Sequence, residues 1–274
     1  MSTELTAENT FPLPGGLMLQ PDHLLNKASL RPPSGHEEEW LARHAGMPSA
    51  ARVTWLLTAC LVSLDDHPVT SDLVRQLLVA DRDYLILQLR RLTLGENIQA
   101  VIPCPVCSNK IDVSFRVSDV PVEARPQTAS SYTLQLSDRN VSFRLPTGGD
   151  QEALLRTKAE DAAAELLRRC ILDEGGRQLS ADESDTLIDF MERVAPQFDL
   201  ELDLKCPECS QQFVAPFDTT AFFFEEMALN GKELLQEIHV LAFYYHWSET
   251  EILRLERDRR RAYLRLLNAF LRPD

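Results

Sequence analysis

The sequence predicts an α+β fold that is mainly helical and contains one small antiparallel β unit. Three observations lead to this prediction. A short cysteine-containing motif occurs twice, at residues 104 and 206. Runs with apolar residues at alternate positions, the period of a half-buried strand, flank both copies. Longer runs with apolar residues three and four positions apart, the period of an amphipathic helix, lie within residues 34–97 and 218–274.

The repeated motif is C-P-x-C-S, found at Cys104–Ser108 and again at Cys206–Ser210. A strand-like run precedes and follows each copy, so both cysteines of a copy lie in a tight turn between strands. Proline between the cysteines fixes φ and helps to keep both sulfurs on one side of the turn. Two such turns supply the four thiolates of a tetrahedral zinc site. The sequence therefore predicts one structural zinc ion in a split zinc-ribbon-like site with these ligands: Cys104, Cys107, Cys206 and Cys209.

The two halves of this site are far apart in the chain. Residues 108–205, a stretch of 98 residues, lie between them, which is far more than the usual ribbon spacing. All four positions around the metal would be filled by protein, which leaves no place for water or substrate. We therefore expect the zinc to stabilise the fold and to take no part in chemistry.

Two other interpretations of the cysteines remain open. A single C-x-x-C is also typical of a redox pair, but that interpretation expects a βαβ surrounding with the thiols at a helix N-terminus. Two separate zinc ions, each completed by histidine or by another chain, are the second alternative. No histidine lies within twenty residues of either motif, which disfavours completion by a neighbouring histidine.

Composition places the chain among globular proteins. It has 274 residues, of which 44% are hydrophobic and 26% charged. The other two cysteines, Cys60 and Cys170, lie in helix-like apolar runs and are expected to be buried core thiols. This is not a disulfide framework, so a reducing compartment is favoured. The first residues show neither a basic nor an apolar signal segment, and no apolar run is long enough to span a membrane, so we expect cytoplasmic localisation at synthesis.

The net charge of −14 is unevenly distributed. Residues 254–274 contain seven arginines and three acids, a charge of +4, and the remaining residues therefore carry −18. Nucleic-acid binding depends on lysines and arginines that neutralise phosphates. The acidic body argues against it.

The chain divides into four expected blocks. Residues 1–33 contain Pro-Gly and Pro-Pro signals without helical period and are expected to form an extended or disordered arm. Residues 34–97 form an N-terminal helical block that opens with the capping box Ser34–Glu37 and continues with helices over 51–64 and 71–94. Within the last helix, the run Asp81–Asp83 is expected to be a solvated, salt-bridged patch.

The third and fourth blocks follow the first cysteine motif. Residues 98–217 form the split zinc-ribbon and β unit, with a hairpin near residues 134–145 and inserted helices over about 150–195. One of these helices is expected from 151 to 172, and another runs from the capping box Ser180–Glu183 to about Val194. Residues 218–274 form a C-terminal helical block, in which the helix from Ile252 to Phe270 follows the capping box Ser248–Glu251. The Arg257–Arg261 cluster is expected either to pair with the acidic body or to contact an acidic partner protein.

Motifs of the common catalytic classes are missing from the sequence. Gly231-Lys232 lacks the other residues of a phosphate-binding loop, and neither G-x-S-x-G nor H-E-x-x-H occurs. No carboxylate pair in an apolar setting suggests acid/base work. We therefore expect no catalytic residues, no small-molecule substrate and no enzymatic activity, and a scaffold or binding role is favoured.

Several segments, taken in order, resemble one family. They are SGHEEEW at 34–40, LVADRDYL at 78–85 with LRR at 89–91, the two cysteine motifs, VSFRLPTGGD at 141–150, YHWSETEI at 245–252 and RRRAYL at 259–264. This order resembles the baseplate hub assembly proteins of T-even-type contractile-tailed phages and of related contractile injection systems. The resemblance covers roughly residues 34–267.

The resemblance implies a non-enzymatic structural or chaperone-like assembly role in a baseplate hub. The implied partners are other baseplate, hub, spike or tube proteins, and the resemblance implies a protein that either helps to assemble the particle or forms part of it. A zinc-ribbon protein that binds nucleic acid or acts with transcription is the alternative, in which the cysteine turns and the arginines of 254–265 would make the contacts. Only Lys110 and Lys205 flank the turns, fewer basic residues than that alternative expects.

Overall fold

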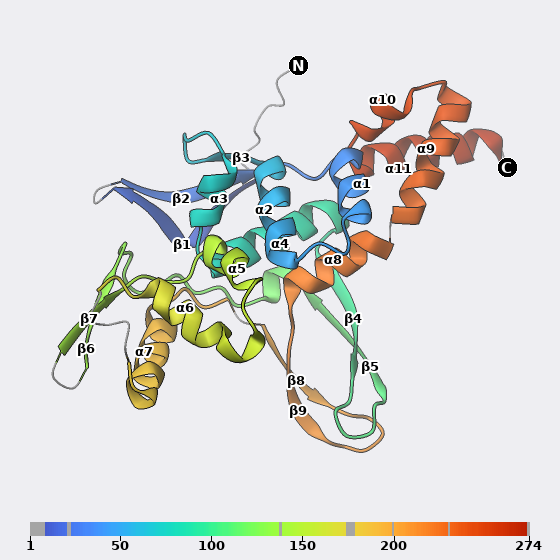
Figure 1. Ribbon diagram of the computed structural model, residues 1–274. Coiled ribbons are helices and arrows are strands. Elements are labelled where there is room, and N and C mark those ends of the chain that lie inside the picture. The colour runs from blue at the N-terminus through green and yellow to red at the C-terminus, as the bar shows by residue number, and fades with distance from the viewer. Residues whose placement is uncertain are drawn as a thin grey trace. The chain divides into compact units, whose positions relative to one another are not determined.

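The structure, a computed structural model, describes residues 9–20, 23–136, 139–173, 179–198, 200–229 and 231–272. It is α+β, as predicted, with helices and small antiparallel sheets (Figure 1). The chain divides into two compact units, each built from three segments. Unit 1 consists of Met1–Leu30, Val53–Leu85 and Pro121–Asp199, and unit 2 of Arg31–Arg52, Ile86–Val120 and Leu200–Asp274.

This division differs from the four consecutive blocks expected from the sequence. Most of the long insertion between the cysteine motifs clusters with the N-terminal strands in unit 1 and not with the strands that carry the cysteines. The chain therefore leaves unit 2 after Val120 and re-enters it at Leu200. Among the described residues, we find no helix that is both long and apolar enough to cross a membrane.

A three-stranded antiparallel sheet of unit 1 has the order β1 (Thr10–Gln20), β2 (His23–Leu30), β3 (Leu61–Leu64). Phe11 and Leu25 of this sheet are only 5% and 1% exposed. Residues 10–20 and 23–30 are therefore extended, as one of the two expectations has it, but they pair in a buried sheet and do not form a separate arm. The proline and glycine signals lie where the β1–β2 register shifts, between Pro12 and Leu17, so they interrupt only part of the ladder. Residues 1–8 and 21–22 lie outside the described residues.

Helix boundaries in the next segment are set by a remote contact. The helices are α2 (Ser49–Cys60), α3 (Ser71–Gln76) and α4 (Val79–Leu94). The single helix predicted over 71–94 is broken at Leu77, whose ψ of 142° belongs to extended backbone. The amide of Gly148 donates to the carbonyl of Leu77 at 3.0 Å, and Leu78 forms a bridge with Thr147. Hydrogen bonds to a distant segment thus replace those of a continuous helix.

The Asp81–Asp83 run is not the solvated patch expected from the sequence, because Asp81 and Arg82 are fully buried in unit 1. The amide of Gly15 donates to Oδ1 of Asp81 at 2.7 Å, and Nη2 of Arg82 donates to Oγ1 of Thr54 at 2.9 Å. Glycine is needed at position 15, since a Cβ there would lie 2.8 Å from Oδ2 of Asp81. Burial raises the pKa of Asp81 to about 6. Asp81 and Arg82 therefore join α4 to strand β1 and to helix α2.

The insertion in unit 1 has its own apolar core. The predicted hairpin is present as β6 (Tyr132–Leu136) and β7 (Arg139–Phe143), and its turn, residues 137–138, lies outside the described residues. The single helix predicted over 151–172 is divided into α5 (Gly148–Leu154), a 3₁₀ turn (Ala159–Asp161) and α6 (Ala162–Cys170). α7 (Ala181–Val194) begins at the predicted capping box. The buried residues that these elements share include Phe143, Cys170 and Leu187.

Asp150, in the first turn of α5, connects several segments of this region. Its carboxylate is buried and accepts from Arg144 at 2.6 and 2.9 Å and from Arg169 at 3.0 Å. The amide and the hydroxyl of Thr147 also donate to it, each at 3.0 Å. Burial alone would raise the pKa of Asp150, but these hydrogen bonds and the Arg144 guanidinium lower it to about 2. The ionised carboxylate therefore stabilises unit 1.

We expect the stabilisation by Asp150 to be present above about pH 4 and to be lost as the pH falls towards about 2. The pKa of Asp150 is about 2 in the folded protein and 3.8 in the unfolded chain. As the pH falls, the unfolded chain therefore binds the proton at a higher pH than the folded protein does, which favours unfolding. This difference in pKa corresponds to roughly 2 kcal/mol of stability. Urea unfolding of the wild type and of Asp150→Asn should show their stability difference shrinking by about this amount over that range. A constant difference would contradict the assignment.

The helices of unit 2 are α1 (Gly35–Arg43), α8 (Thr219–Leu229), α9 (Gly231–Tyr245), α10 (Glu249–Leu253) and α11 (Arg257–Leu271). Capping boxes open α1 and α10 at the serines where they were predicted, Ser34 and Ser248. The helix predicted from Ile252 to Phe270 is two helices, α10 and α11. Asn230, between α8 and α9, lies outside the described residues.

A buried ionic network joins α1, α9 and α11. Glu38 accepts from Nη2 of Arg257 at 2.7 Å and from Nη2 of Arg260 at 2.9 Å. Glu237 accepts from Nε of Arg260 at 2.8 Å. The prediction that the arginine cluster pairs with the protein's own acids is confirmed for these arginines. Arg259 contacts an aromatic ring, and its guanidinium lies 5.2 Å from the centre of the Tyr263 ring.

Candidate metal centre

Two β-hairpins of unit 2 carry the cysteine motifs. One consists of β4 (Asn97–Pro103) and β5 (Lys110–Arg116), and the other of β8 (Glu201–Lys205) and β9 (Gln212–Pro216). Both hairpins extend away from the helices of unit 2 and have their cysteine turns at the far end (Figure 1). The two turns are closed at the same distance from their cysteines. Pro103 pairs with Lys110 in one hairpin, and Lys205 pairs with Gln212 in the other.

The two turns have the same backbone geometry. The amide of the serine that follows each motif donates to the carbonyl of the first cysteine, at 2.9 Å for Ser108 and 3.0 Å for Ser210. These serines have φ values of 58° and 60°, in the left-handed region. The amide of each first cysteine in turn donates across the turn, to Asn109 or Gln211. The repeated sequence thus folds twice into one turn that presents two sulfurs on one side.

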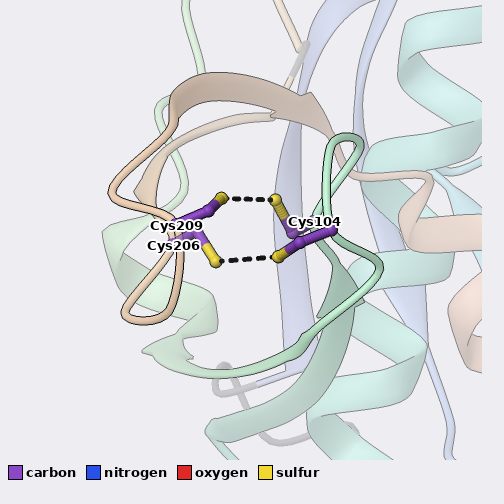
Figure 2. A group of neighbouring side chains, drawn as sticks. Cys104, Cys206 and Cys209 are labelled. Carbon is purple, nitrogen blue, oxygen red and sulfur yellow. Dashed lines mark hydrogen bonds between the residues drawn. The ribbon is translucent and has the colours of Figure 1, made fainter.

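The structure brings all four predicted ligands together. The Sγ atoms lie within 4.8 Å of one another. Sγ of Cys104 is 3.6 Å from Sγ of Cys209, and Sγ of Cys107 is 3.5 Å from Sγ of Cys206. Figure 2 shows the sulfurs of the two turns pointing towards one another across a small gap. Four cysteines from two hairpins therefore form a cluster that could bind a metal ion.

The size of the cluster fits a tetrahedral metal. A zinc–sulfur distance of about 2.3 Å places the four sulfurs of a tetrahedral site about 3.8 Å apart. The two shortest sulfur–sulfur distances between the turns lie within a few tenths of an ångström of that separation, and all four sulfurs lie within 4.8 Å of one another. They are far from the ~2.05 Å of a disulfide bond, and all the cysteines are free thiols.

The turns favour ionised sulfur at the first cysteine of each pair, whereas the neighbouring thiols raise the pKa of the second cysteines, Cys107 and Cys209. The backbone amide of Cys107 donates to the sulfur of Cys104 and lowers the pKa of that thiol to about 6. The amide of Cys209 likewise lowers the pKa of the Cys206 thiol. Metals bind the thiolate form, so these amides prepare the first cysteine of each turn for a ligand role. Cys104 and Cys206 are buried, whereas Cys107 and Cys209 face solvent.

Apolar packing between the hairpins weakens towards the cysteine turns. At the base, Ile98 and Ala215 are buried and the rings of Phe115 and Phe217 meet edge to face at 5.3 Å. Nearer the turns the inward-facing side chains, such as Ile102, are only half-buried. The hairpin ends are therefore not held together by a hydrophobic core. The sulfur cluster lies where such a core would otherwise be.

The environment argues against the alternative interpretations of the cysteines. Each pair lies between two strands and not at a helix N-terminus, which a redox pair would require. The close approach of the pairs disfavours two separate ions. Within the described ranges, this is the one group of three or more potential metal ligands that we find. Cys60 and Cys170 lie elsewhere and are fully buried, as predicted.

Sequence reasoning missed the acidic partners of the arginine cluster, Glu38 and Glu237. Glu38 is one of three consecutive glutamates in α1, and Glu237 is one of two glutamates in α9, so nothing in their local pattern sets them apart. The available signal was on the other side of the contact, because Arg257 and Arg260 lie three residues apart and share a helix face. That spacing suggests a common partner without identifying it.

Comparison with known proteins places the chain in a family. Neither the curated proteins nor the solved structures gave a match. A family model described as T4 bacteriophage base plate protein matches residues 26–224, which is 199 of the 274 residues and includes both cysteine motifs. This agrees with the baseplate part of the resemblance seen in the sequence. The chain therefore belongs to the T4 bacteriophage base plate protein family.

Proposed function

We propose that this protein is a non-enzymatic structural or assembly protein of the baseplate hub in a contractile tail or injection system, and that one structural zinc ion stabilises its fold. The family match over residues 26–224 carries the baseplate part of the proposal. The hub part rests on the ordered segments that resemble hub assembly proteins. The expected partners are hub, spike or tube proteins.

The sulfur cluster supports zinc as the metal. Zinc accepts four thiolates in a tetrahedral site, and soft sulfur ligands select it over magnesium or calcium. A site closed by four protein ligands has no open position for substrate. We therefore assign Cys104, Cys107, Cys206 and Cys209 as ligands of a zinc ion that links the two hairpins.

The nucleic-acid alternative has less support. Binding of DNA or RNA would need exposed basic residues near the cysteine turns, and only Lys110 and Lys205 flank them. Two arginines of the C-terminal cluster, Arg257 and Arg260, are buried in ion pairs with acids of unit 2. They are therefore not free to contact phosphates.

Affinity purification tests the proposed role. The tagged protein, isolated from cells that express the complete set of baseplate genes, should recover hub, spike or tube proteins identified by mass spectrometry. Cells that express the same genes and an untagged copy provide the background. Recovery of none of these proteins would count against the hub role, and salt-sensitive retention of a DNA duplex in a mobility-shift assay would favour the alternative.

A further inference from the structure

The C-terminal half of α11 exposes large apolar side chains. Leu266 and Phe270 are 64% and 80% exposed, and their i, i+4 spacing places them on one face of the helix. Leu267, between them, is buried and anchors the helix to unit 2. Figure 1 shows that this end of α11 extends past α9. Single exposed leucines are common, but a paired leucine and phenylalanine on a projecting helix are typical of a binding surface.

Basic side chains flank this apolar face. Arg265 and Arg272 are exposed, and neither forms a salt bridge with any residue in the described ranges. In a chain whose net charge is −14, this helix end is therefore apolar and locally positive. A partner surface that matches it would be an apolar groove with an acidic rim.

Unit 1 contains a groove of that kind. It lies between α6 and α7 and has a volume of about 330 Å³. Its lining is apolar apart from Glu192, and it includes Ala163, Leu166 and Ile188. The volume is about twice the roughly 150 Å³ of an apolar cavity that holds one benzene ring. The groove therefore has room for a phenyl ring and an adjacent leucine side chain.

The surroundings of the groove are acidic. Residues 159–173 and 179–195, which include both helices, contain nine acidic residues and three arginines, a net charge of −6. Asp189 and Glu192 lie one turn apart on α7 and are exposed. The charge of the groove is thus opposite to that of the α11 end.

We propose that the C-terminal half of α11 binds the α6–α7 groove of a second copy of this chain. Phe270 and Leu266 enter the groove, and Arg265 and Arg272 face its acidic rim. The two contacting surfaces are different, so the interface is head-to-tail, and in a bound pair one copy still has a free groove and the other a free helix end. Such a contact continues into a ring or a chain of copies. It is independent of the proposed zinc site and of the proposed hub role.

Two variants of the full chain test this proposal. Leu266→Asp/Phe270→Asp removes the apolar side chains of the helix, and Ala163→Arg fills the groove with a bulky positive side chain at an exposed position. The matched control is Leu235→Asp/Phe243→Asp, which changes two exposed apolar residues of α9. Circular dichroism melts verify that each variant is folded.

Size-exclusion chromatography with light scattering should show oligomers of the wild type and of the control that grow with concentration. Each test variant should associate at least tenfold more weakly, the order of effect expected for loss of a buried aromatic anchor. An equimolar mixture of the two test variants should form a one-to-one complex, because one retains the groove and the other the helix end. Raised salt should weaken association.

Three results would overturn the proposal. The first is a wild type that is monomeric at its highest soluble concentration. The second is equal association of the wild type and the two test variants. The third is a mixture of the test variants that stays monomeric although the wild type associates, because that excludes a head-to-tail contact through these surfaces.

Discussion

Replacement of Cys104 by serine, or treatment with a chelator, should release the proposed zinc ion and lower the melting temperature by about 10 °C. Structural zinc contributes roughly 10–16 kcal/mol to isolated zinc-finger peptides. We expect a smaller loss here, on the order of 3 kcal/mol, because the helices of unit 2 have their own apolar core. Elemental analysis gives the zinc content, and calorimetry gives the melting temperature. Acid should also release the metal, since protons compete for the thiolates.

Cys60→Ala is the matched control for this experiment. It also removes one thiol, but Cys60 is buried away from the sulfur cluster, so its removal should leave one zinc per chain. Cys60→Ala should still lower stability, because it leaves a cavity in the core. Comparison of the two variants therefore distinguishes the effect of lost packing from the effect of lost metal. A Cys104→Ser protein that retains its zinc and melts like the parent would show that the metal site lies elsewhere.

Replacement of Glu38 by alanine should destabilise unit 2 by about 3–5 kcal/mol, the cost of removing one partner from a buried ion pair. Glu38 is 3% exposed and accepts from Arg257 and Arg260, which are 4% and 0% exposed. Without its carboxylate, Arg257 loses the acid that balances its charge. Urea unfolding followed by fluorescence measures the change in the free energy of unfolding.

The control for this prediction is Glu233→Ala. Glu233 pairs with Arg261 at 3.0 Å, but the two side chains are 57% and 41% exposed. Exposed pairs contribute at most about 1 kcal/mol, so this variant should differ little from the wild type. Equal effects of the two substitutions would mean that burial does not set the strength of the Glu38 contacts.

The sequence was sufficient to predict the cysteine cluster, because a repeated local motif forms the same turn in both places. Capping boxes located the starts of α1, α7 and α10 for the same reason, since each consists of hydrogen bonds within four residues. The pattern of alternating apolar residues predicted the β6–β7 hairpin. All these features depend on contacts close in sequence.

Features set by remote contacts were not predictable in the same way. The break between α3 and α4 depends on Gly148, about seventy residues later in the chain. Burial of Asp81 depends on the glycine at position 15, and burial of Arg260 depends on Glu38. In each case the helical pattern was correct, but the partner that determines the outcome lies in another segment of the sequence.

The separation of the two cysteine turns has a consequence for biogenesis. A ribosome that adds about 5–20 residues per second needs roughly 5–20 s to make the 98 residues between them. During that interval the first turn has two thiols and no second pair with which to close a site. Unit 2 also cannot finish folding until its last segment, which begins at Leu200, has been made. The nascent chain therefore passes through a stage in which unit 1 can be complete while the first two thiols are still open to oxidation or to capture of another metal.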